Sequence, residues 1–256
     1  MAVEKFVDAG VFWAGWNYTG QSNQVTLNRS NAMLDATVFG NHTRVNTAGL
    51  AEMSASVSGF WIGGLIADGA LDPIMHSRLG STGAPLTLYP KDVDLGVAYM
   101  FPGVLGSING FGALGELAPF DAEFNFSPYE SVGVRSQSRG VIGLRHQART
   151  GASGSGTGTQ LGAVTSSQYL VLCVQLTATD SSDVEVILES DDNGAFTTPT
   201  TRITTGSLAG GTGGQAYYAH LAGPLTDDWY RLRWVRTGGS TFTALGTFGV
   251  YTPLSV

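Results

Sequence analysis

The sequence of 256 residues contains little charge and a single cysteine. Charged residues make up only 13% of the chain and hydrophobic residues 43%, with a mean hydropathy of +0.08. Disordered chains combine high charge with low hydrophobicity, so this composition indicates a globular protein. Cys173 has no partner for an internal disulfide, and its place in the apolar run YLVLCVQL predicts a small buried side chain rather than a nucleophile or metal ligand.

Signatures of membrane insertion, export and catalysis are also missing. The sequence has no run of about 18 apolar residues that would predict a transmembrane helix. The N-terminus MAVEKFVDAG lacks the layout of a signal peptide, so we expect synthesis in a cytoplasm and no membrane partner. The four histidines form no HExxH motif or Cys/His pair, and neither a GxSxG elbow nor a P-loop ending occurs. We therefore expect no enzyme activity, no cofactor and no metal.

Basic residues are scarce throughout the chain. Thirteen basic and twenty acidic residues give a net charge of −7, and both halves are acidic. A protein that grips nucleic acid needs a basic face for the phosphates, which this balance does not supply. A protein that lets DNA pass without gripping it is compatible with the same charge.

The residues that are abundant predict an all-β fold. The chain has 36 glycines, and its Val, Thr and aromatic residues gather in short alternating segments separated by turns. One segment, FDAEFNF, places Phe120, Ala122, Phe124 and Phe126 on one face. Its other face carries Asp121, Glu123 and Asn125. Further strands are expected within 24–29, 52–61, 85–89 and 97–101, with one short helix in DGALDPIMHSRLG.

A Gly/Ser/Thr-rich stretch, RTGASGSGTGTQLG, suggests a domain boundary. Its composition is that of a flexible linker, so we expect one domain over residues 1–150, a linker over 151–162 and a second domain over 163–256. A long surface loop within one domain is the alternative. The segments after residue 163 predict a smaller antiparallel β-sandwich of immunoglobulin-like type, in which Arg231, Arg233 and Arg236 reach solvent.

Two acidic segments of the second half invite chemical interpretations. ESDDNGAFTTPT matches the early positions of a calcium loop but lacks the closing Glu, so a hairpin turn with positive φ at Asn193-Gly194 is favoured. Asp227 and Asp228 could be proposed as paired catalytic carboxylates, as could Asp121 with Glu123. A solvated turn and an ordinary wet strand face explain the same residues.

A long connection in the first half follows neither the strand nor the helix period. It covers roughly 21 residues, Ser30 to Leu50, and contains the apolar residues Met33, Leu34, Val38 and Phe39. Connections longer than about 12–15 residues are uncommon in compact domains and are usually functional or disordered. Because these apolar side chains need a surface to bury against, we expect an arm that orders on another subunit.

Two stretches of the sequence resemble the tail tube proteins, or major tail proteins, of long-tailed bacteriophages. The first is SNQVTLNRSNAMLDATVFGNHTRVNTAGLAEMSASVSGFW, where a strand leads into LDAT, FG, TR and AGL and then into a second strand. The second is GVLGSINGFGALGELAPFDAEF, where a turn leads into a strand. The C-terminal part is similar to an accessory β domain appended to phage virion proteins.

The resemblance implies a β-barrel or β-sandwich core that assembles, usually as hexameric rings, into a stacked tube in the virion tail. Double-stranded DNA would pass through its lumen without specific binding, and the partners would be copies of the chain and other tail proteins. The inter-ring or inter-subunit loop would carry the following residues of this sequence: Leu34, Asp35, Thr37, Phe39, His42, Arg44 and Leu50. The candidate lumen face is that of Asp121, Glu123 and Asn125.

Two other functions remain open from the sequence. The chain could be a capsid or tail decoration protein whose C-terminal sandwich binds host surface glycans through the arginines or aromatics of WYRLRWVR. It could also be a β-sandwich enzyme that cleaves glycans, in which case removal of one carboxylate would abolish turnover.

Overall fold

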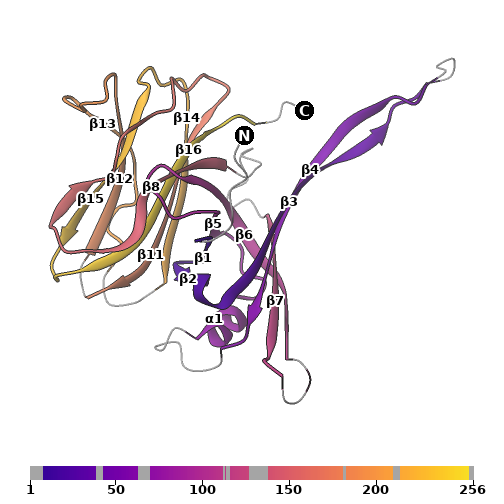
Figure 1. Cartoon of the computed structure of the whole chain (residues 1–256). Coiled ribbons are helices and arrows are strands. Elements are labelled where there is room, and N and C mark those ends of the chain that lie inside the picture. The colour runs from indigo at the N-terminus through magenta and orange to yellow at the C-terminus, as the bar shows by residue number, and fades with distance from the viewer. Residues whose placement is uncertain are drawn as a thin grey trace. The chain divides into compact units, whose positions relative to one another are not determined.

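A computed structural model describes residues 8–38, 43–62, 70–111, 113, 116–126, 138–180, 183–209 and 214–253. Within them the fold is almost entirely antiparallel β-structure, which confirms the all-β prediction (Figure 1). The helices in this part of the chain are the short α1 (Leu71–Arg78), which was expected, and a 3₁₀ turn, η1 (Thr19–Gln21).

The chain folds into two compact units that do not follow the expected boundary near residue 150. Unit 1 comprises the described residues within Met1–Gly20, Gly83–Pro102 and Gln137–Pro253. Unit 2 comprises those within Gln21–Thr82 and Gly103–Ser136. Strands from the two ends of the sequence therefore belong to the same unit.

Unit 1 contains a β-sandwich of two antiparallel sheets, as the C-terminal sequence predicts. Its first sheet has the strand order β14-β11-β16-β8-β6-β5-β1-β2, of which the first half of β6 lies in this unit. These strands are β1 (Gly10–Trp13), β2 (Trp16–Asn17), β5 (Ala84–Tyr89), β6 (Val97–Gly110), β8 (Ser138–Arg149), β11 (Tyr169–Thr179), β14 (Gln215–Ala222) and β16 (Phe242–Tyr251). The second sheet consists of β9 (Ser153–Ser155), β10 (Thr159–Gln160), β12 (Asp183–Asp191), β13 (Thr200–Thr204) and β15 (Trp229–Thr237).

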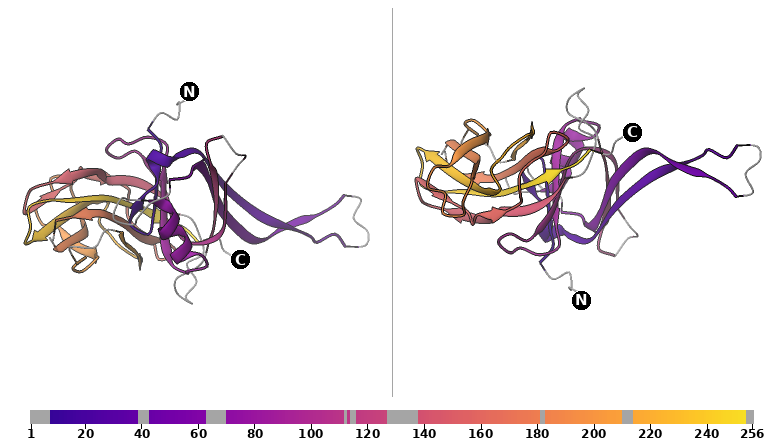
Figure 2. Two further views of the ribbon diagram at one scale, coloured as in Figure 1. Left: turned by 90° about the horizontal axis from the view of Figure 1, so that it is seen from below. Right: turned by 90° about the horizontal axis from the view of Figure 1, so that it is seen from above.

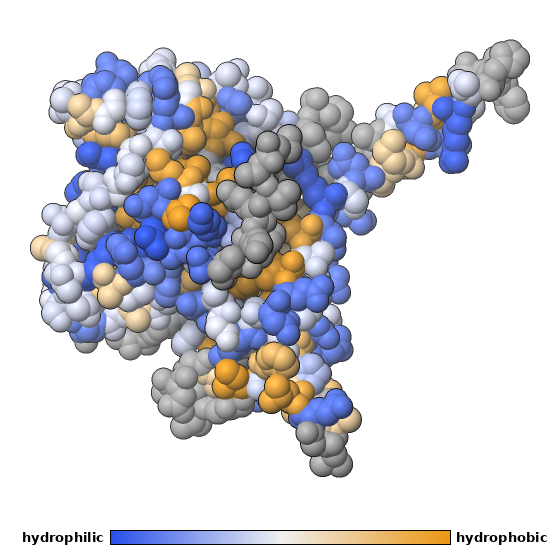
Figure 3. Space-filling model, viewed as in Figure 1, coloured by the Kyte–Doolittle hydropathy of each residue, from blue (hydrophilic) through white to orange (hydrophobic). Residues whose placement is uncertain are grey.

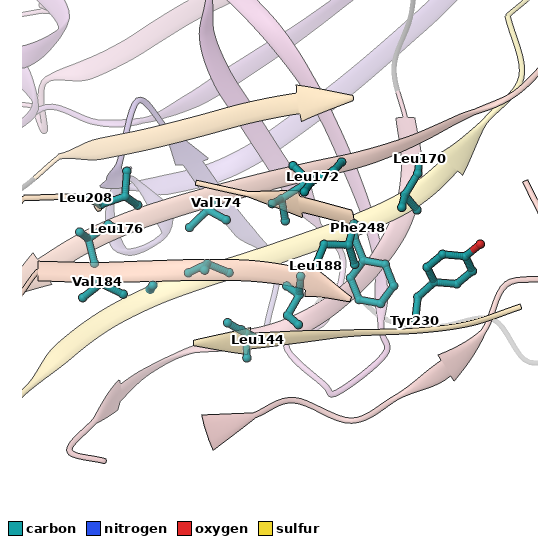
Figure 4. Packing of buried hydrophobic residues seen from close by; sticks show 14 of the residues in the cluster. Leu144, Leu170, Leu172, Val174, Leu176, Val184, Leu188, Leu208, Tyr230 and Phe248 are labelled. Carbon is teal, nitrogen blue, oxygen red and sulfur yellow. The ribbon is translucent and has the colours of Figure 1, made fainter. Parts of the chain in front are cut away.

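The core of unit 1 lies between these two sheets (Figure 4). Leu172 and Val174 of β11 and Phe248 of β16 belong to the same buried cluster as Leu188 of β12 and Tyr230 of β15. β11 is buried along most of its length, so its apolar sequence shows no alternation. Cys173 lies in this strand, fully buried, and burial raises the pKa of its thiol to about 11, in agreement with the expected inert side chain.

The Gly/Ser/Thr-rich segment expected to be a flexible linker forms part of the second sheet. Ser153–Ser155 of β9 pair with Val235–Arg233 of β15, and β10 pairs with the start of the same strand. The glycines allow close approach: a Cβ added at Gly154 would lie 2.1 Å from the ring of Trp234. Glycine-rich composition here reflects tight packing rather than a spacer.

The described residues of unit 2 form a four-stranded antiparallel sheet accompanied by α1. Its strands are β3 (Ser22–Asp35), β4 (Asn46–Phe60), β7 (Pro119–Phe126) and the second half of β6, in the order β3-β4-β7-β6. β7 alternates as predicted, with Phe120, Ala122 and Phe124 buried and the residues between them exposed. Val57 and Ala55 of β4 lie opposite this apolar face of β7 and are also buried.

Candidate functional site

The β3–β4 hairpin extends beyond the sheet that carries it. β4 pairs with β3 along nearly its whole length, from Gly59 to Asn46. In the described chain its ladder with β7 runs only from Phe60 to Ser54. The outer part of the hairpin is therefore a two-stranded ribbon, and both ribbon figures show it running clear of β6 and β7 (Figures 1 and 2). We call the described residues within 29–53 the arm.

The prediction of a long irregular connection over Ser30–Leu50 is wrong. β3 continues to Asp35 and β4 already begins at Asn46, so the two strands cover most of that stretch. Sequence reasoning missed these strands because alternation arises only where one face of a strand is buried. The described side chains of the outer half of β3 are exposed on both faces, which leaves no period to detect.

Apolar side chains of the arm point into solvent. Met33 and Leu34 are 64% and 54% exposed, and Val38 and Val45 near the tip are exposed as well. Neighbouring residues of a strand point to opposite faces, so neither face of the ribbon is covered at this position. Figure 3 shows an apolar group toward the outer end of the hairpin. An isolated two-stranded hairpin is at best marginally stable in water, so this geometry favours a partner surface.

A small polar network fixes the tip of the arm. Asp35 accepts hydrogen bonds from the Thr37 backbone N–H at 3.0 Å and from Arg44 Nε at 3.1 Å. The Thr37 hydroxyl accepts one from the Val45 N–H, and the Ala36 N–H donates to the Val45 carbonyl. Hydrogen bonding from Thr37 holds the pKa of the Asp35 carboxyl below its ordinary value. The Asp35–Arg44 ion pair also neutralises the charge of the tip.

The structure brings together four of the residues expected in the inter-subunit loop. Leu34, Asp35, Thr37 and Arg44 all lie at the outer end of the arm, where the last three brace the turn. Phe39 and His42 lie outside the described residues. Leu50 belongs to β4 by its backbone, and its side chain is likewise outside the description.

The candidate lumen residues lie on a larger polar face of the unit 2 sheet. Glu123 is directly opposite Ser56 on β4 and Ser107 on β6, and Asp121 is opposite Ser58 and Asn109. Cross-strand partners share one face, so the pairs extend it over four strands. We call this surface the polar face: Gln24, Thr26, Asn28, Ser54, Ser56, Ser58, Ser107, Asn109, Asp121, Glu123 and Asn125.

Charge on the polar face has one sign. Its charged side chains are Asp121 and Glu123, and its other members are small or medium-sized neutral residues. A shallow depression of about 430 Å³ lies over Ser54, Glu123 and Asn125 and reaches Glu52, which pairs with Ser30 at the base of the arm. Asp121, Glu123 and Glu52 thus give this region acidic character, which repels phosphate.

Sequence reasoning found three residues of the polar face and missed that the others join them. The serines of β4 alternate visibly in EMSASVSGFW, which marks them as one side of a strand. Only the register of β4 against β7 shows that this side continues the side of Asp121 and Glu123.

The arginines of β15 are engaged inside unit 1 rather than free to hold a ligand. Arg231 Nε lies 2.7 Å from Glu189 Oε1, with its guanidinium 4.2 Å from the centre of the Phe196 ring. Arg233 Nε is 3.6 Å from Glu189 Oε2, and Arg236 donates to backbone carbonyls, including Thr150 at 3.0 Å. All three arginines are partly exposed, as expected, but these contacts occupy their guanidinium groups.

The acidic turn after β12 is organised by its own backbone. Asp191 accepts from the Asn193 N–H at 3.2 Å and from the Thr198 N–H at 2.9 Å, so both its oxygens are engaged. The predicted positive φ at Asn193-Gly194 is wrong, because the residue with positive φ in this turn is Phe196, at 51°. Among the described residues, no group of three or more His, Cys, Asp or Glu side chains is placed to hold a metal ion.

Asp227 is not part of a merely solvated turn. Its Oδ2 accepts from Ser190 Oγ at 2.7 Å and from Arg202 Nη2 at 2.8 Å, and these hydrogen bonds lower the pKa of its carboxyl. The neighbouring Asp228 instead accepts from Gln160 Nε2 at 2.5 Å. The two carboxylates therefore serve separate contacts between strands.

In the described part of the chain, no helix has the length and apolar character needed to cross a membrane.

Comparisons with known proteins give distant structural likenesses. No family model and no curated protein match the sequence. One similar solved chain belongs to the virion of a native gene transfer agent particle, with 12% identity and a TM-score of 0.35 over 46% of this chain and 84% of that chain.

Two further structures are similar at a comparable level. A chain from the tail of an empty gene transfer agent particle, refined with C6 symmetry, shows 15% identity and a TM-score of 0.39 over 54% of this chain and 98% of that chain. The Dit protein of SPP1, described as a paradigm of the hub adsorption apparatus of phages that infect Gram-positive hosts, shows 12% identity and a TM-score of 0.39 over 95% of this chain and 99% of that chain.

Proposed function

We propose that this chain is a structural protein of a phage tail, and specifically a tail tube subunit that assembles with copies of itself. The observation that carries the proposal is the arm, whose apolar residues Met33 and Leu34 are exposed on opposite faces of a two-stranded ribbon. Such a ribbon gains stability by docking on another subunit, because docking removes apolar surface from water. The resemblance of the surrounding sequence to tail tube proteins supports the same assignment.

In this proposal the subunits form rings, six to a ring, that stack into a tube within the virion tail. The polar face of unit 2 lines the lumen, where Asp121 and Glu123 repel phosphate and the serines offer no strong contact. Double-stranded DNA then passes without being held, because a tight grip requires basic side chains that neutralise phosphates. The chain is made in the host cytoplasm, and its other partners are further tail proteins.

Assembly of the purified chain tests this function. We expect rings or tubes in negative-stain images and large particles in sedimentation velocity, and we expect the double variant Met33→Ser/Leu34→Ser to remain monomeric. Surface substitutions away from packed features usually change the free energy of unfolding by less than about 0.5 kcal/mol, so the variant should stay folded.

Val93→Ser is the matched control, because Val93 is another exposed apolar residue, in unit 1. The control variant should assemble like the wild type. If the wild-type chain stays monomeric at high concentration, or if the arm variant assembles normally, the arm does not drive assembly and the proposal fails.

A further inference from the structure

A second apolar surface lies at the end of unit 2 away from the arm. Phe111 and Leu117, in the turn between β6 and β7, are 75% and 74% exposed. Phe60 and Ile62, at and just after the end of β4, are also exposed, and the Trp61 ring lies 5.3 Å from the ring of Phe111. Figure 3 shows apolar residues at the surface around α1 and the nearby strand ends. We call Phe60, Trp61, Ile62, Phe111 and Leu117 the end patch.

The backbone holds the end patch in a defined form. The Trp61 N–H donates to the Ala118 carbonyl at 2.8 Å, and the Phe111 N–H donates to the Pro119 carbonyl at 3.2 Å, which ties the turn to β4 and β7. Phe111 has a φ of 73°, in the left-handed region that aromatic residues rarely adopt. Strained residues persist where surrounding structure imposes them and are enriched at functional sites. Here the strained residue is one with an exposed aromatic ring.

The arm and the end patch lie at opposite ends of one strand. β4 begins at Asn46 in the arm and ends at Phe60 in the patch, so its 15 residues separate the two surfaces. At about 3.3 Å per residue, that strand spans roughly 45 Å. Both surfaces belong to unit 2, and the paired length of β4 holds the arm of a chain away from its own end patch.

We propose that the end patch receives the arm of a second copy of this chain. This inference rests on the proposed function and adds the surface on which the arm docks. Two different surfaces of one molecule that fit each other make a heterologous contact, which propagates head to tail instead of closing as a dimer. Exposed apolar side chains of comparable kind occur on both sides, with Met33, Leu34 and Val45 available to cover Phe111 and Leu117.

Charge favours a second copy as the occupant. The chain carries a net charge of −7, so whole subunits repel one another. Residues 29–53 contain two basic residues, Arg29 and Arg44, and two acidic residues, Asp35 and Glu52, and are formally neutral. The end patch itself contains no charged residue. The arm is therefore an element of this acidic chain that approaches the patch of another copy without net repulsion.

Cysteine cross-linking tests the contact, because the native Cys173 is fully buried and does not interfere. We expect the double variant Met33→Cys/Leu117→Cys, treated with a short bismaleimide, to give a ladder of covalent multimers in denaturing gels. A mixture of the two single variants should give dimers and no ladder, since each molecule then offers one reactive end. Met33→Cys/Val93→Cys is the control with a cysteine outside the end patch and should give no ladder.

The outcomes separate this inference from the proposed function. If Met33→Cys/Leu117→Cys forms tubes but cross-linking gives no ladder of multimers, the inference is wrong and the proposed function still holds. Dimers from Met33→Cys alone would show that arms pair with arms, and they also overturn it. A wild-type chain that never assembles overturns both.

Discussion

Ser56 of β4 lies directly opposite Glu123 of β7, and this pair joins the serine-rich side of one strand to the acidic side of the other. The register places Ser58 opposite Asp121 and Ser54 opposite Asn125 in the same way. The resulting polar face carries negative charge and no positive charge. A wall of this composition repels the phosphates of DNA.

Charge reversal on the polar face should make the lumen retain DNA. In the variant Asp121→Lys/Glu123→Lys both exposed side chains become basic, so we expect the monomer to keep its stability within about 0.5 kcal/mol and still to assemble. Tubes assembled with short DNA duplexes should then protect DNA from nuclease at low salt and release it as salt rises, because binding through phosphates releases counterions.

The control for charge reversal is Asp94→Lys/Asp192→Lys, which adds the same charge at exposed positions of unit 1. DNA attracted to that surface would remain open to nuclease. Equal protection in the two variants would argue against the polar face as the lumen wall.

The brace at the arm tip should make assembly sensitive to acid. Because the pKa of Asp35 is lowered, its charged form favours the braced tip, and this contribution is present at neutral pH and lost as pH falls through the lowered pKa. We expect the wild type to lose assembly at acidic pH more steeply than Asp35→Asn, which should assemble weakly at every pH. Light scattering across a pH series measures both, with Asp94→Asn as the control. Identical pH profiles of assembly for wild type and Asp35→Asn would show that Asp35 does not make assembly sensitive to acid.

Glycines of the segment 149–162 should be needed for packing. A Cβ at Gly154 would lie 2.1 Å from the Trp234 ring, and one at Gly156 would lie 1.9 Å from the carbonyl oxygen of Gly143. Overpacking a well-packed site typically costs about 1–3 kcal/mol, so each Gly→Ala variant should lose that much free energy of unfolding. Each should therefore unfold at a lower denaturant concentration than the wild type. Gly20→Ala, at a position with nothing within 4 Å, is the control and should cost less. Normal stability of the Gly154 and Gly156 variants would contradict the packing role and indicate that the segment is a flexible linker.

The buried carboxylate of Glu189 should matter for the stability of unit 1. Its side chain is 4% exposed and faces Arg231 at 2.7 Å and Arg233 at 3.6 Å. Removal of one partner of a buried ion pair leaves the other charge uncompensated, so Glu189→Ala should cost about 3 kcal/mol in chemical denaturation. Glu189→Gln, which keeps the shape and one acceptor oxygen, should cost less. A loss of assembly without any loss of stability would show that the arginines serve another purpose.

Truncation tests the expected division at residue 150. β8 ends at Arg149 and pairs with β16, which begins at Phe242, so a chain that stops at residue 160 leaves β8 without this neighbour. We expect such a chain to lose the fold of unit 1, with loss of near-ultraviolet circular dichroism and of cooperative thermal unfolding. A truncated chain that remains folded and polymerises would instead support a separate N-terminal tube domain.

Much of the fold can be predicted from the sequence where strands have one wet and one buried face, or are buried altogether. The alternation of FDAEFNF defines both faces of β7, and the apolar run of Tyr169–Thr179 defines β11 with its observed bounds. The outer halves of β3 and β4 were missed, since exposure on both faces removes the pattern. β14 was missed because every residue of it up to Leu221 is only partly buried, so neither face stands out.

By itself the sequence determined the all-β class, the acidic balance and the inert cysteine, because each follows from local composition and spacing. The tertiary structure decided what those residues meet. It turned a presumed linker into packed glycines through the Trp234 ring, joined β8 to β16 across the expected boundary, and set Ser56 opposite Glu123. The physical reason is that strand pairing is non-local: register depends on which distant segments bury their apolar faces together, and no local pattern contains that information.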